Sequence, residues 1–421
     1  MTQKISAPRG TKDILPGEIY KWHYIERVAR SVAADFGFEE IRFPTFEHTE
    51  LFLRGVGETT DVVQKEMYTF EDKGGRSITL RPEGTASVVR SFLENSLYGA
   101  GLPVKAYYIA PNFRYEKPQA GRLREHHQFG VECFGAEGPA ADAEVIDLAA
   151  TYMARLGIKN VSLEINSLGC PNCRPNFQKA LYDYFKAHED ALCDTCRERL
   201  EKNPLRILDC KSPACQEIAK GAPVGLDYLC DECSDHFDGL KGYLKAMDIA
   251  FEVNPRIVRG LDYYTRTVFE FVSTGIGAQG TVCGGGRYDS LVSTLGGDPM
   301  PGLGFGSGIE RMLLVMEAEG VEIPKPTGPD LFIAALGGEA DQRAQQLVHQ
   351  LRRMNVSAQR DLAGRGLKAQ MKVAGRIGAR YSLVLGEDEI KTSQAVLKNM
   401  ETGEKADCSL DAGAIKKQIE A

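Results

Sequence analysis

The stretch VKAYYIAPNFRYEKPQAGRLREHHQFGVECFG, residues 104–135, shapes the expectations about the fold. Its two ends, 104–110 and 128–135, are rich in aromatic and β-branched residues, which favours strands. The polar segment between them carries three arginines. The sequence therefore predicts a pair of strands joined by a long, charged loop.

The second strand of this pair has two different faces, because successive side chains point to opposite sides of a strand. One face is apolar and can pack on helices: Phe129, Val131 and Cys133. The other carries an amide, a glycine and a carboxylate: Gln128, Gly130 and Glu132. Such polar groups are odd in a core and natural in a ligand-binding site. A half-solvated sheet edge with surface charges would explain them equally well.

Outside the pair, apolar residues spaced by three and four predict a helix over 19–36, which Gly37 ends, and another over 140–156. A short predicted strand, 38–43, stops at Pro44. The Gly-rich region from about 257 to 311 is strand-like.

The segment GVEIPKPTGPD, residues 320–330, contains three prolines and two glycines, which is typical of a linker. After it, LFIAAL, a helical run over 340–354 and YSLVLG follow one another. This β-α-β order predicts a small α/β domain at the end of the chain.

Size and composition exclude several classes of protein. The chain has 421 residues, 26% charged and 43% hydrophobic, which is not typical of disordered, collagenous or coiled-coil proteins. At about 100–200 residues per domain, two or three domains are expected. No apolar run approaches the roughly 18–20 residues needed to cross a bilayer, so we expect no membrane partner. Residues 1–16 resemble neither a secretion signal nor an import signal, so we expect a cytoplasmic protein.

Charge and glycine patterns limit how the chain could bind nucleotides or nucleic acids. The net charge is −7, so a nucleic-acid partner would have to be held by local basic patches. The sequence lacks G-x-x-x-x-G-K-[ST], and the glycines at 302, 304, 306 and 308 do not fit G-x-G-x-x-G. Any nucleotide is therefore expected to bind without a P-loop or a dinucleotide-binding motif.

Three more segments carry residue types suited to ligands. RGLDYY, residues 259–264, combines the guanidinium group of an arginine with the phenolic hydroxyls of two tyrosines. CGGGRYD, residues 283–289, permits close approach of a ligand to the backbone, but alone it is better explained as a flexible turn. GLGFGSGIER, residues 302–311, leaves one strand face bare, against which a flat ring could lie with Arg311 reaching over it. A kinked strand beside close-packed helices is the alternative for that last segment.

Together these segments resemble a known family. The resemblance rests on RGTKD at 9–13, RPEGT at 81–85, the Phe113-Arg114-x-Glu116 turn, and the segments 259–264, 283–289 and 302–311. In order and spacing they are similar to the histidyl-tRNA synthetases, a branch of the class II aminoacyl-tRNA synthetases. The turn and the Gly-rich strand are shared across class II, whereas 259–264 and 283–289 are specific to the histidine branch.

The resemblance implies an α+β fold with an antiparallel class II sheet and flanking helices. It places a catalytic domain at 1–169 and 240–322, and an inserted, helical, Cys-rich domain at 170–239. A linker at 323–329 leads to an α/β anticodon-binding domain at 330–421. A homodimer interface is expected around the first long helix and Pro44.

The implied reaction attaches L-histidine to tRNA(His) through a histidyl-adenylate, with ATP as substrate and Mg²⁺ as cofactor. The resemblance assigns Arg114 and Arg259 to catalysis, where they grip the α-phosphate from two sides, and also to the histidine site. It assigns the rest of the histidine site to six polar and aromatic side chains: Glu83, Thr85, Gln128, Glu132, Tyr263 and Tyr264. ATP is expected to contact Arg114 and four further residues: Glu116, Arg122, His126 and Arg311.

One position departs from the family pattern. Many relatives carry Phe where this chain has His126, which is expected to stack on adenine. Histidine can still stack, with less apolar area. We expect ATP binding to survive, with some pH dependence.

Two regions are expected to contact tRNA(His). In the loop between the two strands, Gln119 is the candidate contact to the extra 5′ guanosine of this tRNA. In the C-terminal domain, four basic residues are spaced by three, four and four, which would place them on one helix face: Arg365, Lys368, Lys372 and Arg376. A solvated helix face is the alternative.

Eight of the eleven cysteines lie between Cys170 and Cys233. Taken in order, the first four (170, 173, 193, 196) match a four-thiolate zinc spacing, and the last four (210, 215, 230, 233) approximate a second. Structural Zn²⁺ is one interpretation. Because zinc is not a general requirement of the family, the other is a helical insertion with reduced cysteines, and no metal ligand is assigned.

Two other functions compete with the synthetase. One is a non-catalytic paralogue that serves as a regulatory subunit or a tRNA sensor. Such regulatory relatives typically lack the C-terminal domain and some of the arginines, and this chain has both. The other is a synthetase for a different amino acid, against which segment 259–264 argues.

Overall fold

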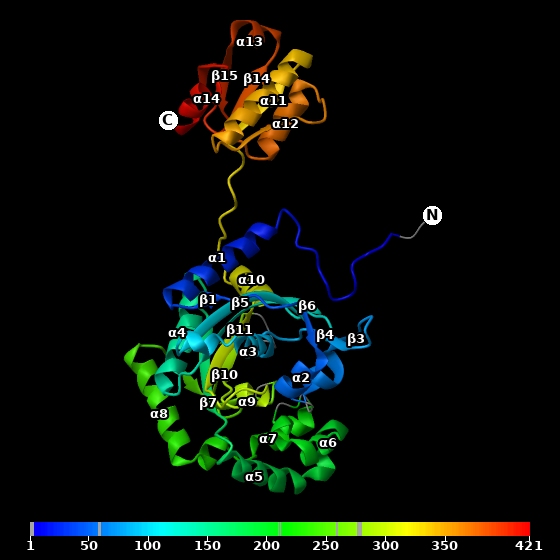
Figure 1. Cartoon of the computed structure of the whole chain (residues 1–421), viewed down its shortest axis with the longest axis vertical. Coiled ribbons are helices and arrows are strands. Elements are labelled where there is room, and N and C mark those ends of the chain that lie inside the picture. The colour runs from blue at the N-terminus through cyan, green and yellow to red at the C-terminus, as the bar shows by residue number, and fades with distance from the viewer. Residues whose placement is uncertain (1–3, 58–59, 209, 211, 258–259, 276–279) are drawn as a thin grey trace. The chain divides into compact units, whose positions relative to one another are not determined.

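The computed structural model describes residues 4–57, 60–208, 210, 212–257, 260–275 and 280–421. The chain divides into two compact units, Met1–Ile323 and Pro324–Ala421 (Figure 1). Their boundary falls within the segment expected to be a linker. In the described part of the chain, no helix is both long and apolar enough to cross a membrane.

A mixed eight-stranded sheet forms the centre of the first unit. From β5 to β7 neighbouring strands are antiparallel, whereas the edge strands β1 and β8 pair in parallel with β5 and β7. The strands are, in sheet order, β1 (Glu39–Glu40), β5 (Val104–Phe113), β6 (Glu125–Phe134), β11 (Gly302–Gly308), β10 (Thr281–Arg287), β9 (Thr265–Ser273), β7 (Val161–Ser167) and β8 (Glu252–Val253). The α+β expectation is confirmed.

Helices cover both faces of this sheet (Figure 1). The apolar face of β6 packs with α1 (Ile19–Asp35), α4 (Pro139–Arg155) and α10 (Ile309–Ala318) into the largest core cluster, as its residue pattern predicted. The opposite face packs with α3 (Thr85–Glu94) and α9 (Leu291–Thr294). The helix expected over 19–36 buries Trp22, Ile25 and Ala29 at the predicted spacing.

The strand pair is longer than the sequence predicted, because β5 and β6 continue three residues farther into the loop on each side. The strand expected over 38–43 is reduced to the two residues of β1. Beside the main sheet, a three-stranded sheet joins β2 (Phe46–His48), β4 (Ser77–Leu80) and β3 (Tyr68–Glu71), and α2 (Thr49–Val56) follows β2. The first unit also contains a short π-helix, η1 (Val62–Glu66), and a 3₁₀ helix, η2 (Leu97–Ala100).

The interpretation of CGGGRYD as a flexible turn is wrong, because β10 is an interior strand paired with β9 and β11. A Cβ on Gly285 would collide with the carbonyl oxygen of Gly304, and one on Gly286 would collide with that of Thr267. The glycines are needed because neighbouring strands approach this backbone closely.

The Cys-rich segment is helical, as expected. It contains α5 (Arg174–Lys186), α6 (Asp194–Lys202), α7 (Pro213–Lys220) and the start of α8 (Asp231–Ala246), with short turns η3 (Glu189–Ala191), η4 (Pro204–Ile207) and η5 (Gly225–Tyr228). The grouping of its cysteines by sequence order is wrong. Instead the first and last pairs lie together, and the four middle cysteines form a second set.

The second unit contains a five-stranded sheet in the order β13-β12-β14-β15-β16. Its strands are β12 (Leu331–Ala335), β13 (Ala358–Arg360), β14 (Tyr381–Leu385), β15 (Gln394–Asn399) and β16 (Lys405–Ser409). Its helices are α11 (Gly338–Arg353), α12 (Leu367–Arg376), α13 (Glu387–Thr392) and α14 (Ala412–Glu420). The predicted β-α-β order is confirmed as β12, α11 and β14.

Candidate active site

The centre of the sheet presents a row of glycines on one face. Gly130 of β6 pairs with Gly306 of β11, which pairs with Gly284 of β10. Tyr108 flanks this row on β5 and Glu270 flanks it on β9. The polar face of β6 and the bare face of β11, which the sequence predicted separately, are therefore one continuous surface.

Two buried carboxylates lie at one end of this surface. Glu83 precedes α3, and its oxygens accept the backbone N–H groups of Thr85 and Ala86, both at 2.8 Å. Glu132 of β6 accepts a hydrogen bond from the Thr85 hydroxyl at 2.7 Å, and its other oxygen accepts one from the Tyr288 hydroxyl. We call Glu83, Thr85, Glu132 and Tyr288 the carboxylate cluster.

Burial raises the pKa of Glu132 well above its usual value, although the Tyr288 and Thr85 hydroxyls favour the carboxylate. Burial also raises the pKa of Glu83, against the N–H donors of Ala86 and Thr85. Among the described residues, the side chains that shift the pKa of Glu132 most are hydroxyls and a second carboxylate. The cluster is therefore electrostatically suited to a ligand that brings positive charge or N–H donors.

The tyrosines predicted for this site are close to the carboxylates. The Tyr263 hydroxyl lies 3.4 Å from Glu83 Oε2, and its ring lies 5.6 Å from the Tyr288 ring. The Tyr264 ring packs against the Tyr263 ring at a tilt of 45°, with 4.8 Å between the ring centroids. Gln128, on the same strand face as Glu132, accepts a hydrogen bond from Asn112 Nδ2 at 2.7 Å.

A second group of residues, the arginine cluster, contains Arg114, Glu116, Arg122, His126 and Arg311. The Glu116 carboxylate forms an ion pair with Arg122 and lies 3.9 Å from Arg114. Arg311 of α10 donates from Nε to the Gly121 carbonyl at 3.2 Å, beside Arg122.

Arg114 connects the two clusters. Its Nε donates to the Pro82 carbonyl at 2.8 Å, next to Glu83. Its charge favours the ionised form of Glu83. Arg114 after β5, Arg122 in the loop and Arg311 on α10 therefore lie around one region, as the sequence predicted, whereas Arg259 lies outside the described residues.

Burial and the charges of Arg114, Arg311, His127 and Arg122 lower the pKa of His126 to about 3. The ring is therefore neutral at physiological pH. A pKa this low gives His126 no change of charge near neutral pH in the ligand-free protein.

Four of the five residues predicted to contact tRNA are exposed where the sequence placed them, and Arg365 lies outside the predicted helix. Gln119 is exposed in a tight turn with Arg122. Lys368, Lys372 and Arg376 are exposed on α12. The prediction that Arg365 shares this helix is wrong, because α12 begins at Leu367 and the Arg365 guanidinium is bound to Asp361 at 2.6 Å.

Sequence reasoning missed Tyr108, Asn112 and Tyr288. Tyr288 follows the triple glycine, and the strand alternation of β10 could have indicated it. Tyr108 lies so close to Gly84 and Gly130 that a Cβ on either would collide with its ring. That contact joins segments far apart in sequence, so no local pattern could reveal it.

Comparisons with known proteins agree on one family. Residues 10–199 and 216–312 match the family described as histidyl-tRNA synthetase, and residues 330–417 match an anticodon binding domain. A histidine–tRNA ligase from Acetivibrio thermocellus is 58% identical over 405 residues, 96% of this chain and 97% of the relative. One from Caldanaerobacter subterraneus subsp. tengcongensis is 57% identical over the same shares.

A solved structure gives the same result. The crystal structure of apo S. aureus histidyl-tRNA synthetase matches with a TM-score of 0.84 and 40% identity. The match covers 98% of this chain and 99% of that one. With sequence relatives of this identity along nearly the whole length, the chain belongs to the histidyl-tRNA synthetase family.

Proposed function

We propose that this protein is a histidine–tRNA ligase, a class II synthetase that uses ATP to attach L-histidine to tRNA(His). Histidine and ATP give histidyl-adenylate and pyrophosphate, and the histidyl group then passes to the tRNA with release of AMP. The observation that carries this proposal is the junction at Arg114, where a buried carboxylate cluster meets an arginine cluster on one face of the sheet.

The first step needs positioning more than proton transfer. A free α-carboxyl has a pKa of about 3.5, so the histidine carboxylate is ionised before it attacks the α-phosphorus. The difficulty is that one anion approaches another, and guanidinium groups are suited to hold both. We assign Arg114 and Arg259 to the α-phosphate and the carboxylate, and Arg122 and Arg311 to the β and γ phosphates.

Magnesium fits the same region. Mg²⁺ prefers carboxylate and phosphate oxygens, and the buried Glu116 carboxylate lies among the phosphate-binding arginines. When bound, the ion would neutralise charge on the phosphates. Glu116 also orients Arg122 through their ion pair.

Histidine recognition is assigned to the carboxylate cluster and its neighbours. Glu83, Thr85 and Gln128 would hold the α-amino group. Glu132 and Tyr264 would contact the imidazole nitrogens, with Tyr263 beside them. A site whose buried polar groups need partners discriminates strongly against ligands that lack those partners, by up to about 10⁴–10⁵. The raised pKa of Glu132 supports this role, because a ring N–H would satisfy its carboxylate.

The adenine ring is assigned to the glycine row and His126. At Gly306 a Cβ would approach Gln128 Nε2 to 3.3 Å, so glycine keeps this part of the strand surface bare. His126 would stack as a neutral ring, which avoids adding a further charge beside the arginines.

The remaining assignments concern domains and partners. We assign catalysis to residues 1–169 and 240–322, and anticodon binding to 330–421, with the insertion at 170–239. A homodimer, which the family resemblance implies, and a cytoplasmic location remain predictions. Gln119 and the basic face of α12 are the proposed tRNA contacts.

Histidine-dependent exchange between pyrophosphate and ATP tests the proposal. Arg114→Ala and Arg259→Ala are each expected to lower the exchange rate by at least about 10²–10³ while the protein stays folded. Arg76→Ala is the matched control, because Arg76 is exposed and pairs with Asp72 away from the site. Near-normal exchange in either site variant would refute its assignment, and exchange with another amino acid alone would refute the ligase specificity.

Salt dependence of tRNA binding tests the helix α12. If Lys368, Lys372 and Arg376 contact phosphates, neutralising all three to Gln should weaken binding and reduce the slope of log affinity against log salt by about two to three. An unchanged slope would favour a solvated helix face instead.

A further inference from the structure

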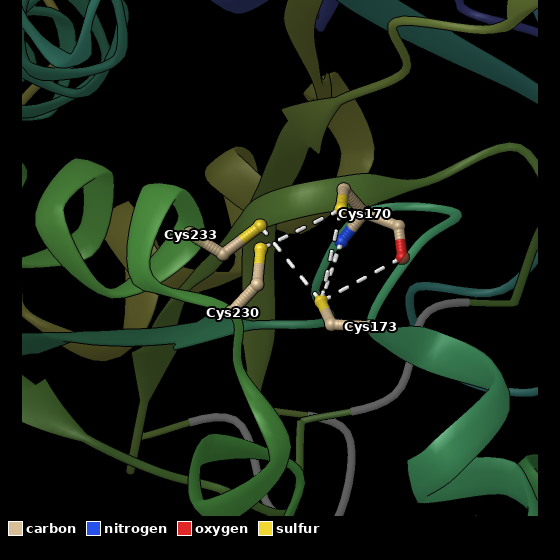
Figure 2. Close-up of side chains that lie close together, drawn as sticks. All are labelled: Cys170, Cys173, Cys230 and Cys233. Atoms are coloured by element: carbon tan, nitrogen blue, oxygen red, sulfur yellow. Dashed lines mark hydrogen bonds between the residues drawn. The ribbon is translucent and has the colours of Figure 1, made fainter.

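The eight cysteines of the insertion form two compact sets. The first set contains Cys170, Cys173, Cys230 and Cys233, and the second contains Cys193, Cys196, Cys210 and Cys215. Within each set all four sulfur atoms lie within 4.8 Å of one another. Figure 2 shows the first set, in which the turn after β7 and the start of α8 direct four side chains toward one point.

We propose that each set binds one Zn²⁺ ion through four cysteine thiolates. Four thiolates at about 2.3 Å from zinc form a tetrahedron whose sulfur atoms are about 3.8 Å apart. In the first set, the Sγ atom of Cys170 lies 3.8 Å from the Sγ atoms of both Cys173 and Cys230. The Sγ atom of Cys173 lies 3.9 Å from that of Cys233. In the second set, the Sγ atom of Cys193 lies 3.8 Å from that of Cys210. These separations are those of a tetrahedral four-thiolate site.

Other uses of the cysteines fit less well. A disulfide needs a sulfur–sulfur distance of about 2.05 Å, and all eight thiols are free. An iron–sulfur cluster places several iron and sulfide atoms between its cysteine ligands, which requires more space than sulfurs within 4.8 Å leave. The geometry therefore favours a single ion in each set.

The local backbone prepares the thiolates for metal. Cys193 and Cys230 directly precede α6 and α8, and Cys196 and Cys233 follow three residues later. Backbone N–H groups also point at sulfur: that of Cys170 lies 3.2 Å from Cys173 Sγ, and that of Cys193 lies 3.3 Å from Cys215 Sγ. Such donors stabilise negative charge on a thiolate, as helix N-termini do.

The order of the cysteines explains what the ions would stabilise. The first set joins the beginning and the end of the insertion, and the second set joins segments inside it. A segment of this size, between 170 and 233, is below the roughly 70–80 residues at which a hydrophobic core alone usually suffices. Its core is a small cluster that includes Cys196 and Cys215 themselves. Two structural ions would supply the stability that this core lacks.

The insertion also contacts a segment of the proposed histidine site. Arg174, next to Cys173, donates to the Tyr264 carbonyl at 2.5 Å. Arg206, between Cys196 and Cys210, donates to the Gly260 carbonyl at 3.0 Å and to Asp262 at 2.7 Å. Metal in the insertion would therefore fix two arginines that hold residues 260–264 in place.

Metal analysis of the purified, full-length protein tests the proposal. Cells grown with added zinc should yield about two zinc ions per chain without iron. A double variant in either set should retain about one ion, and a double variant of two buried cysteines outside the sets should retain about two. The variants are Cys173→Ser/Cys233→Ser, Cys196→Ser/Cys215→Ser and, as the control, Cys133→Ser/Cys408→Ser.

A measurement on the unaltered protein covers the case in which a site variant fails to fold. In the zinc-loaded protein both sets should resist a thiol-reactive dye, and a zinc chelator should release about two ions and expose about eight thiols together. Refilling with Co²⁺ should give thiolate-to-cobalt charge-transfer absorption. Less than about 0.2 zinc per chain, iron in place of zinc, or thiol reactivity that does not change with the chelator would overturn the proposal.

Discussion

Arg287 and Tyr288 are neighbours in the sequence, yet each donates to a different buried carboxylate. Arg287 binds Asp142 of α4, with Nε at 3.0 and 2.8 Å from its two oxygens. Tyr288 binds Glu132 of β6. Both carboxylates are almost fully buried, at 2% and 1% exposure. Their burial is equal, so the difference between them comes from their partners.

The partners shift the two carboxylates in opposite directions. Burial alone would raise the pKa of Asp142, but His236 and Arg287 lower it below its usual value. Burial raises the pKa of Glu132, and its hydroxyl partners do not reverse the shift. A carboxylate buried with its own guanidinium serves the fold, whereas one buried with hydroxyls leaves the positive charge to be supplied by a ligand.

The largest expected effect is on stability, at the first of these carboxylates. Asp142→Asn removes the buried countercharge of Arg287 and, among the described residues, leaves it only Asp289, 3.3 Å from Nη1, so the free energy of unfolding should fall by up to about 3–5 kcal/mol. Trp22, the only tryptophan, lies in the same core cluster as the adjoining residues of α4, so its fluorescence can follow denaturant unfolding.

Asp72→Asn is the control for this variant, because Asp72 pairs with Arg76 at the surface and such pairs contribute about 0–1 kcal/mol. A loss below about 1 kcal/mol in Asp142→Asn would show that the buried ion pair does not stabilise the fold.

The second effect is on catalysis, at the other carboxylate. Glu132→Gln should lower kcat/KM for histidine by about 10²–10³, because it replaces the proposed acceptor of the imidazole N–H. The free energy of unfolding should not fall, since a neutral amide replaces a carboxylate whose pKa burial raises. KM for ATP should stay within about twofold. A stability loss like that of Asp142→Asn would remove the contrast between the two sites.

The sequence predicted the strand face on which Glu132 lies, but it did not predict the partner of Arg287. Glu132 was predicted because strand alternation and a recognisable motif both depend on neighbouring residues. Arg287 lies in an equally recognisable motif, CGGGRYD, but its partner Asp142 is 145 residues away on α4. Periodicity reports which face of an element is apolar, and it does not report which charged residues meet across the core.

The cysteines illustrate the same limit. Their spacing predicted two possible four-thiolate sets, and the structure groups them differently because the chain returns at Cys230 to the turn that contains Cys170. Local spacing identifies CxxC pairs, but the path of the chain between pairs decides which pairs meet. Arg365 was placed on α12 by spacing alone, and its ion pair with Asp361 holds it before the helix instead.

A smaller effect is expected when one hydroxyl partner of Glu132 is removed. Tyr288→Phe should raise KM for histidine by about tenfold, because a hydrogen bond to a charged group contributes about 1.5–3 kcal/mol and Thr85 still donates to the other oxygen. Tyr182→Phe, which removes a hydroxyl bound to exposed Glu201, is the control. Steady-state kinetics that show equal KM values in both variants would mean that Tyr288 does not orient Glu132.

The smallest effect is the pH dependence of the two stability changes, which is expected at Glu132 and not at Asp142 between pH 8 and pH 5. Glu132 has a raised pKa in the folded state, so its ionisation costs stability at high pH, and this cost declines as pH falls below the folded pKa toward the unfolded one. Asp142 has a lowered pKa, so its contribution is present above the unfolded value and is lost only as pH falls through the folded one. Any stability gained by Glu132→Gln should therefore shrink between pH 8 and pH 5. The loss in Asp142→Asn should stay constant over that range, because the usual pKa of aspartate, about 3.9, lies below it.

Denaturant midpoints at pH 8, 6.5 and 5 would show both trends, and parallel curves for the two variants would mean that the carboxylates do not differ in ionisation.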